Sequence, residues 1–372
     1  MQQIQRANLE SFSNITLLRA VASLMVVYDH LFSLEPSRHF GAAAFPVSRV
    51  QAAIDGPLGI IQDFGWIGVA IFFIVSGFII THVSMRESQT EFLVKRIFRI
   101  YPPLILAILI ACAATFITTG QTFSPWEIVS AFSLANYWMS PQIIILGVAW
   151  TLAIEVIFYA FTFALLPILK RSPCAAIVIQ VLVIFCVYAV RGKFGDGFFL
   201  FSACVAYLPY LIVGQVTYFL YSRAIGVKVF FALLLLVYVA TLFGIKLIHV
   251  AFLPVNNSYL INFVYAYFIF VLLLIYKDKL RVPVFVQRLA DSSYSIYLLH
   301  GAIGGTVIVL MARHTSNHSI AIVTLTSILA AVLSILGAWV FFLLVEKPSI
   351  KVARNLCRLI GTKKPVVHKD QA

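Results

Sequence analysis

Ten apolar stretches, most of them about 20 residues long, are separated along the chain by short polar segments. A helix needs about 20 consecutive apolar residues to cross the ~30 Å hydrocarbon core of a bilayer. Of the 372 residues, 62% are hydrophobic and 11% are charged, whereas soluble domains are about half apolar and a quarter charged. Lipid must therefore act as the solvent for much of this surface. The sequence predicts an all-α integral membrane protein with about ten transmembrane helices.

The predicted spans follow from hydropathy and from residues that end helices. They cover residues 15–34, 66–85, 101–119, 144–167, 175–190, 199–221, 227–246, 258–276, 294–312 and 319–345. Pro348 is expected to end the last helix, because proline commonly follows a helix terminus. We expect residues 1–14 to form an N-terminal cytoplasmic segment, residues 15–346 the membrane domain, and residues 347–372 a basic cytoplasmic tail.

Lysine and arginine residues indicate the orientation of the chain. With ten spans both termini share one side, and that side holds 20 of the 27 Lys and Arg residues, while the other holds 6 and Arg19 lies within the first span. Cytoplasmic loops carry such an excess, so both termini are expected in the cytoplasm. Membrane topology thus accounts for the net charge of +13, and no basic domain for nucleic acid is present.

The first span contains two costly polar residues, Arg19 and His30. They are eleven residues apart, so an α-helix places them on one face, roughly 16 Å apart along its axis. Ionisable residues within a membrane are functional candidates, and histidine is well suited to proton transfer near neutral pH. The alternative is that Arg19 extends to the interface while His30 bonds a neighbouring helix. Asp29 either orients an imidazole or pairs elsewhere.

Two arginines, Arg96 and Arg99, lie three residues apart at the predicted cytoplasmic end of the third span. On a helix they share a face, and paired arginines suit a phosphate-bearing ligand. Ordinary anchoring by positive charge is the alternative interpretation.

Further polar residues interrupt later spans. Glu155 lies near the centre of the fourth span, where its carboxyl must be neutral or paired, and Tyr159 lies one turn further along. Tyr294, Tyr297 and His300 recur every three residues on one face of the ninth span. This stripe lines a polar cavity or bonds neighbouring helices; the sequence leaves both open.

Two shorter motifs have simpler interpretations. Ser76-Gly77, within the second span, is typical of close helix packing. Glu346, at the end of the last span, forms either a salt link at the helix end or part of a site. The five cysteines lack C-x-x-C spacing, so we expect no metal site built from them.

Taken in order, these motifs resemble the membrane acyltransferase family 3. The resemblance covers residues 14 to 350 and rests on six motifs: Arg19-x10-His30, F-F-I-V-S-G-F-I-I, the R-x-x-R of Arg96 and Arg99, W-T-L-A-I-E-V-I-F-Y, Y-S-I-Y-L-L-H and E-K-P. Each motif alone is weakly specific, but six in the same order are strong.

The resemblance implies a ten-helix enzyme of the bacterial cytoplasmic membrane. Members take an acyl group, usually acetyl, from cytoplasmic acyl-coenzyme A and transfer it to a hydroxyl of a lipid-linked or exported glycan. It implies membrane lipids and polysaccharide assembly proteins as partners, and no metal. Some relatives carry an SGNH hydrolase-like domain; we expect none here, because the chain ends soon after Glu346.

The resemblance also implies roles for single residues. Arg19 and His30 match the family's essential pair, and Arg96 with Arg99 matches its cytoplasmic arginine pair. We hypothesise that His30 is a general base or a transient acyl carrier, that Arg19 binds phosphate or an oxyanion, and that Glu155 orients or balances the histidine. Asp29, Tyr159, Tyr294, Tyr297 and His300 are candidate cavity-lining residues.

Two other functions remain as alternatives. Buried charges on ten spans also suit a proton-coupled secondary transporter, although no inverted repeat is visible. A glycan flippase is the other alternative, and it does not need an arginine pair at the cytoplasmic end. Binding of acetyl-coenzyme A distinguishes the acyltransferase from both.

Overall fold

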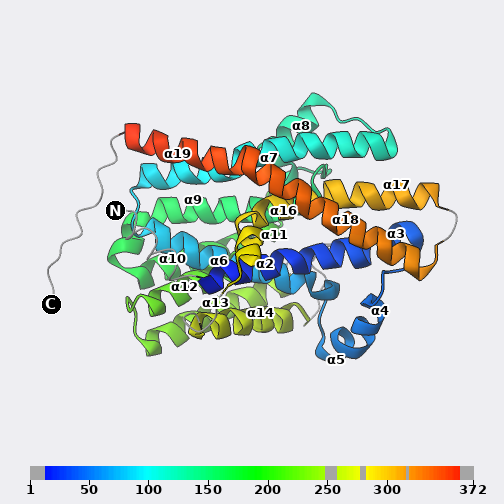
Figure 1. Cartoon of the computed structure of the whole chain (residues 1–372). Coiled ribbons are helices and arrows are strands. Elements are labelled where there is room, and N and C mark those ends of the chain that lie inside the picture. Colours follow the sequence, from blue (N-terminus) through cyan, green and yellow to red (C-terminus); the bar gives the residue numbers. More distant parts are fainter. Residues whose placement is uncertain (1–12, 248–257, 277–281, 316–317, 361–372) are drawn as a thin grey trace.

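A computed structural model describes residues 13–247, 258–276, 282–315 and 318–360, and within these ranges the chain forms helices and no strands. Ten helical segments of the described chain are long and apolar enough to span a membrane, which confirms the predicted number. Figure 1 shows these helices packed side by side, with the start of α2 and the end of α19 toward the same end of the bundle.

Several spans consist of two helices. The spans are α2 (Ser13–Tyr28) with α3 (Glu35–Phe40), α6 (Gly65–Ser84), α7 (Gln89–Thr119), α9 (Trp150–Arg171), α10 (Pro173–Val190), α11 (Gly195–Val205) with α12 (Leu208–Tyr221), α13 (Val227–Leu247), α14 (Ser258–Ile275), α16 (Ser293–His300) with α17 (Thr306–His314), and α18 (Ile320–Phe341) with α19 (Lys347–Leu359). The short helices α4 (Val47–Val50), α5 (Gly56–Leu58), α8 (Pro125–Phe132) and α15 (Val284–Asp291) lie between spans.

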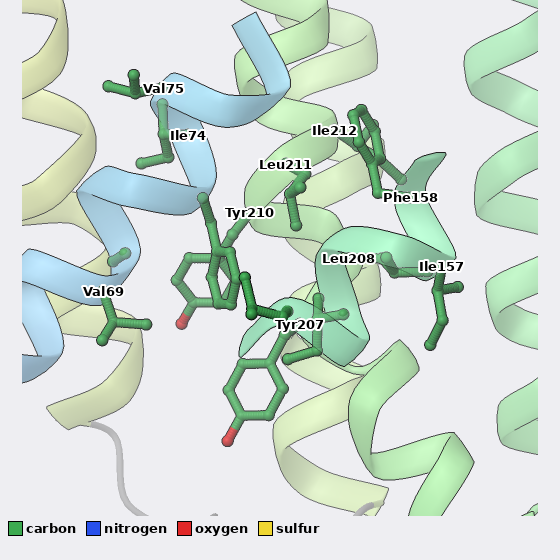
Figure 2. Close-up of a cluster of buried hydrophobic side chains, with 14 of the residues drawn as sticks. Val69, Ile74, Val75, Ile157, Phe158, Tyr207, Leu208, Tyr210, Leu211 and Ile212 are labelled. Carbon is green, nitrogen blue, oxygen red and sulfur yellow. The ribbon is translucent and has the colours of Figure 1, made fainter. Parts of the chain in front are cut away.

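Helix α6 lies at the centre of the bundle and packs most closely against α12 and α2. A β-carbon added to Gly77 would come within 1.8 Å of the Leu211 carbonyl oxygen, and one added to Gly214 within 2.0 Å of the Ile74 carbonyl oxygen. The close packing predicted at Ser76-Gly77 is therefore confirmed. Figure 2 shows part of the apolar core built around this crossing, with Ile74 from α6, Phe158 from α9 and Leu211 from α12.

The predicted start of the third span was wrong. Helix α7 begins at Gln89 and continues through Pro102 and Pro103. Proline has no N–H, so Pro102 leaves the Phe98 carbonyl without its usual helical partner. The Ser349 hydroxyl donates a hydrogen bond to that carbonyl from α19. A side chain thus replaces the missing backbone donor, as is common for prolines in membrane helices.

The predicted end of the last span was also wrong. The helix passes from α18 through the π-helical turn Phe342–Glu346 into α19, and Pro348 lies in the first turn of α19. Proline is tolerated at the start of a helical segment, where an N–H has no helical partner. Residues 347–359 of the expected tail are consequently helical and pack against α7.

Four π-helical turns occur in the described chain: η1 (Asp29–Leu34), η2 (Gln51–Asp55), η6 (Gly301–Gly305) and η7 (Phe342–Glu346). Each contains or directly follows a buried titratable residue, namely Asp29, Asp55, His300 or Glu346. Such turns are rare and often mark functional sites, because the extra residue redirects the side chains around it. Three of these turns, η1, η6 and η7, lie within spans. A functional site is therefore expected in the interior of the bundle.

Candidate active site

Two adjoining cavities lie inside the bundle. The larger, about 320 Å³, is called the His30 cavity and is lined by Val26, Asp29, His30, Leu34, Gln62, Gly65, Trp66, Val69, Tyr137, Gln142, Ile144, Gly147, Val148, Trp150, Cys204, Tyr207 and Tyr297. The smaller, about 70 Å³, is called the Arg19 cavity and is lined by Arg19, Val69, Phe72, Phe73, Ser76, Arg99, Ile100, Thr151, Leu152, Glu155, Ser293, Tyr294 and Tyr297. Val69 and Tyr297 line both, so these two side chains lie between the cavities.

Two titratable side chains lie beside the His30 imidazole. Its Nδ1 lies 2.7 Å from Nε2 of His300, and the two ring centroids are 4.9 Å apart. Its Nε2 lies 3.8 Å from Oδ2 of Asp29, the residue before it in the π turn. An imidazole between a carboxylate and a second imidazole has the arrangement expected of a general base. Asp29 was expected either to orient an imidazole or to pair elsewhere. Its side chain lies beside the imidazole of His30.

Part of the wall of the His30 cavity is aromatic. The indole planes of Trp66 and Trp150 are parallel to within 4°, with centroids 6.2 Å apart, and the Tyr207 ring lies 5.2 Å from Trp150. The buried Tyr207 hydroxyl has no hydrogen-bond partner among the described residues. Figure 2 shows Tyr207 at the break between α11 and α12. Aromatic faces next to an unpartnered hydroxyl suit a ligand whose ring carries hydroxyl groups.

Sequence reasoning missed these aromatic residues as part of the site. The sixth span was predicted as one helix over residues 199–221, whereas α11 ends at Val205 and α12 begins at Leu208. Pro209 in the first turn of α12 is the signal for this break. The interruption places Tyr207 between the two helices, where its ring lines the cavity.

Charged side chains from three helices line the Arg19 cavity. Arg19 and Arg99 line it together with Glu155, and Arg99 also lies close enough to Glu346 for charge attraction. The Glu346 carboxylate is 1% exposed and accepts a hydrogen bond of 2.7 Å from Ser295. Glu155 accepts a bond of 2.6 Å from the Tyr159 hydroxyl. Burying guanidinium groups carries a large desolvation cost, and the attraction of these carboxylates offsets part of it.

Outside the membrane-spanning segments, Asp291 lies near the same charges. Burial raises the pKa of Asp291, while the attraction of Arg19 and Lys347 opposes that rise. The end of α15 therefore adds a third carboxyl to the surroundings of Arg19.

The two arginines of the R-x-x-R motif have different environments, although both lie on α7. Arg99 lines the Arg19 cavity, whereas Arg96 does not. The Arg96 guanidinium lies 5.9 Å from the centroid of the Tyr159 ring and 4.0 Å from a carboxylate oxygen of Glu87. Its Nε is buried and has no partner among the described residues. Arg96 therefore carries one buried N–H group that no described residue accepts.

The three residues of the stripe on the ninth span lie in different places relative to the cavities. Tyr294 lines the Arg19 cavity and donates a hydrogen bond of 3.2 Å to the Ile100 carbonyl. Tyr297 lies between the cavities, where its hydroxyl donates to the Val148 carbonyl at 3.2 Å and accepts from Thr151 at 3.0 Å. His300 lines neither cavity and instead bonds His30, and Tyr159 likewise lies outside both linings. Within the described residues, no group of three or more His, Cys, Asp or Glu is placed to hold a metal ion.

Comparison with known proteins identifies the family of the chain. Residues 12–343 match the family model described as an acyltransferase domain. The chain is 25% identical over 335 residues to Nodulation protein 10 of Rhizobium leguminosarum bv. viciae, covering 80% of this chain and 84% of that protein. No solved structure matches the chain significantly. The match spans nearly the whole membrane domain, so the chain belongs to the acyltransferase family 3 and is a multi-pass membrane acyltransferase.

Proposed function

We propose that this protein transfers an acetyl group from cytoplasmic acetyl-coenzyme A to a hydroxyl of a cell-surface or lipid-linked glycan. The observation that carries the proposal is the pair of adjoining cavities, one holding a histidine base and the other two arginines. A reaction between an anionic donor and a neutral hydroxyl needs these two environments next to each other.

The Arg19 cavity is the proposed end for the donor. Coenzyme A carries several phosphates, and arginine binds phosphate through paired hydrogen bonds. Arg19 and Arg99 line the cavity, and the unpartnered Nε of Arg96 supplies a further donor nearby. Glu155 and Glu346 attract the same arginines and balance part of their charge.

The His30 cavity is the proposed place for the acceptor. His30 removes the proton of the acceptor hydroxyl, and the oxygen attacks the thioester carbonyl. The new carbon–oxygen bond forms as the carbon–sulfur bond breaks, and the leaving thiolate takes the proton back from His30. Transfer of the acetyl group to His30 itself before the acceptor attacks is the second route, and mass spectrometry after an acid quench distinguishes the two.

The proposed orientation places both termini, and hence the Arg19 end of α2, at the cytoplasm. The support is the count of 20 Lys and Arg residues on the side of the termini against 6 on the other. This orientation is that of the bacterial cytoplasmic membrane, with the donor on the side where coenzyme A is made. A fluorescent protein fused after residue 372 should fluoresce, whereas alkaline phosphatase fused there should be inactive. The reverse pattern would contradict the orientation.

Binding of the donor tests the function. Purified protein in lipid nanodiscs should bind acetyl-coenzyme A by calorimetry, and Arg19→Ala and Arg99→Ala should weaken binding in a salt-dependent manner. Arg171 is an exposed arginine at the C-terminal end of α9 and lines neither cavity. Arg171→Ala is therefore the matched control and should bind acetyl-coenzyme A normally. A transporter or a flippase would not bind the donor.

Cells provide the second test. Mass spectrometry of surface glycans from cells with and without the gene should show loss of acetyl groups, and the fragment that loses them identifies the acceptor. Complementation with the wild-type gene should restore acetylation, and complementation with His30→Ala should not. Full acetylation with His30→Ala would show that the proposed chemistry is wrong.

A further inference from the structure

His300 is a titratable residue in the interior that contacts neither cavity. Its side chain is fully buried, and both ring nitrogens have partners. Nε2 lies 2.7 Å from Nδ1 of His30, and Nδ1 lies 3.1 Å from the carbonyl oxygen of Ile296, one turn earlier in α16. A buried side chain this constrained is in a position to control the residue that it touches.

The partners of His300 determine which nitrogen carries each proton. The Ile296 carbonyl only accepts hydrogen bonds, so Nδ1 of His300 must carry a hydrogen. A neutral His300 then has a lone pair at Nε2, because a neutral imidazole donates from one nitrogen and accepts at the other. The neutral form is favoured here, because no carboxylate pairs with His300 among the described residues and burying an unpaired cation is costly.

The same argument then extends to His30. Since Nε2 of His300 accepts, Nδ1 of His30 must donate, and the lone pair of His30 is at Nε2. That nitrogen lies 3.8 Å from Oδ2 of Asp29, and both residues line the His30 cavity. The hydrogen-bond chain from the Ile296 carbonyl through His300 therefore selects one tautomer of His30, the one with its base at Nε2.

The fold brings the two histidines together by close packing. The π turn η6 follows His300 directly, and η1 contains His30. A β-carbon on Gly304 of η6 would come within 2.5 Å of Leu31 and 2.7 Å of the Ser334 hydroxyl. The absence of a side chain at Gly304 lets the two π turns approach, and Ser334 also donates to the His300 carbonyl at 3.4 Å.

We infer that His300 is a positioning residue for the acyl transfer, acting through His30 and not on the substrate. It holds His30 in the tautomer whose Nε2 takes the acceptor proton, and it keeps the Nδ1–H bond while His30 is protonated. This inference rests on the proposed function. Asp29, beside Nε2, stabilises the imidazolium that forms, and His300 itself stays neutral throughout.

Two substitutions at one position test this role in the purified protein. His300→Met removes the acceptor, whereas the side-chain carbonyl of His300→Gln restores one for Nδ1–H of His30. We expect kcat to fall about 10²-fold or more with methionine, because a base in the wrong tautomer is ineffective. The KM for acetyl-coenzyme A should stay within about 3-fold, since His300 does not line the Arg19 cavity, and glutamine should recover at least about 10-fold of the lost kcat.

The controls separate this inference from the proposed function. His318→Met, at an exposed histidine, should keep wild-type kcat. If the wild-type protein transfers the acyl group and His30→Ala does not, the proposed function is supported whatever the His300 variants do. With that result in hand, wild-type kcat in His300→Met would overturn the positioning role. Equal losses of kcat in His300→Met and His300→Gln would also overturn it, because a purely structural role does not depend on a hydrogen-bond acceptor. A KM for the donor that rises as much as kcat falls would overturn it as well.

Discussion

The Asp29 carboxylate occupies the space that a side chain at Gly65 would need. A β-carbon on Gly65 would lie 2.4 Å from Oδ2 of Asp29 and 2.7 Å from its β-carbon. Gly65 is the first residue of α6, so the carboxylate lies at the N-terminus of a 20-residue helix. The missing side chain at Gly65 leaves the space that the carboxyl of Asp29 fills. The central helix of the bundle thus makes room for Asp29 beside His30.

Gly65→Ala should displace Asp29 and lower acyl transfer. The clash includes the β-carbon of Asp29, so a rotation of the carboxylate alone cannot relieve it. We expect kcat to fall at least about 10-fold and stability to fall by about 1–3 kcal/mol. Steady-state kinetics and thermal unfolding in detergent measure the two effects. Gly226→Ala, where nothing lies within 4 Å, is the matched control, and equal behaviour of the two variants would contradict the prediction.

Asp29→Asn should lower kcat while leaving donor binding intact. The amide keeps the size of the side chain but removes the charge that stabilises the imidazolium at Nε2 of His30. Groups in this role contribute about 10²–10⁴-fold, and the 3.8 Å separation favours the lower end. Calorimetry with acetyl-coenzyme A should give a wild-type Kd. An Asp29→Asn variant with unchanged kcat would show that Asp29 only packs against α6.

Glu346→Gln should destabilise the protein. Glutamine can still accept the hydrogen bond from Ser295, but Arg19 and Arg99 lose a buried carboxylate. Removing one partner of a buried charge network costs about 3–5 kcal/mol. Thermal unfolding in detergent measures the loss, with Asp196→Asn, at an exposed position, as the control. Equal unfolding temperatures for the two variants would mean that the arginines do not depend on Glu346.

Stability should depend on pH through Asp55, which lies outside the spans. Burial, together with the neighbouring Asp63 carboxyl, raises the pKa of Asp55 to about 6. The folded protein therefore holds a proton that the unfolded chain releases near pH 4. This favours the folded state below about pH 4, and the contribution is lost as the pH rises through about 6.

Asp55→Asn removes this dependence. The variant should unfold at a higher temperature than the wild type at pH 8, and the difference should vanish near pH 4, as measured by thermal unfolding across this range. Asp196→Asn again serves as the control for a change of charge. A difference that grows toward acid would show that Asp55 is stabilised as a carboxylate.

The number of spans could be predicted from the sequence, but several of their ends could not. Apolar length fixes the number because the hydrocarbon thickness is constant. The boundaries predicted near Pro102 and Pro348 failed because neither proline ends its helix. At Pro102, Ser349 supplies the missing donor from a helix about 250 residues away. Pro348 instead lies in the first turn of α19, where a missing N–H is tolerated.

The site could be predicted in part. Arg19 and His30 are identifiable because charge within the membrane is costly, and that argument needs no structure. The partner of His30 was out of reach, since His300 lies 270 residues away and the stripe that contains it is equally consistent with a cavity. The separation of Arg96 from Arg99 was also hidden, because residues three apart on a helix can point to either side of a neighbour such as Tyr159.

The position of Tyr297 between the cavities has a consequence for the cell. A protein that receives its donor on one side of a membrane and serves an acceptor on the other risks becoming a leak for protons and ions. A tyrosine ring, held at its hydroxyl by Val148 and Thr151, separates the two cavities. For the function proposed above, we expect this ring to restrict the passage of water and ions between the two cavities, and so to limit the loss of an ion gradient during transfer.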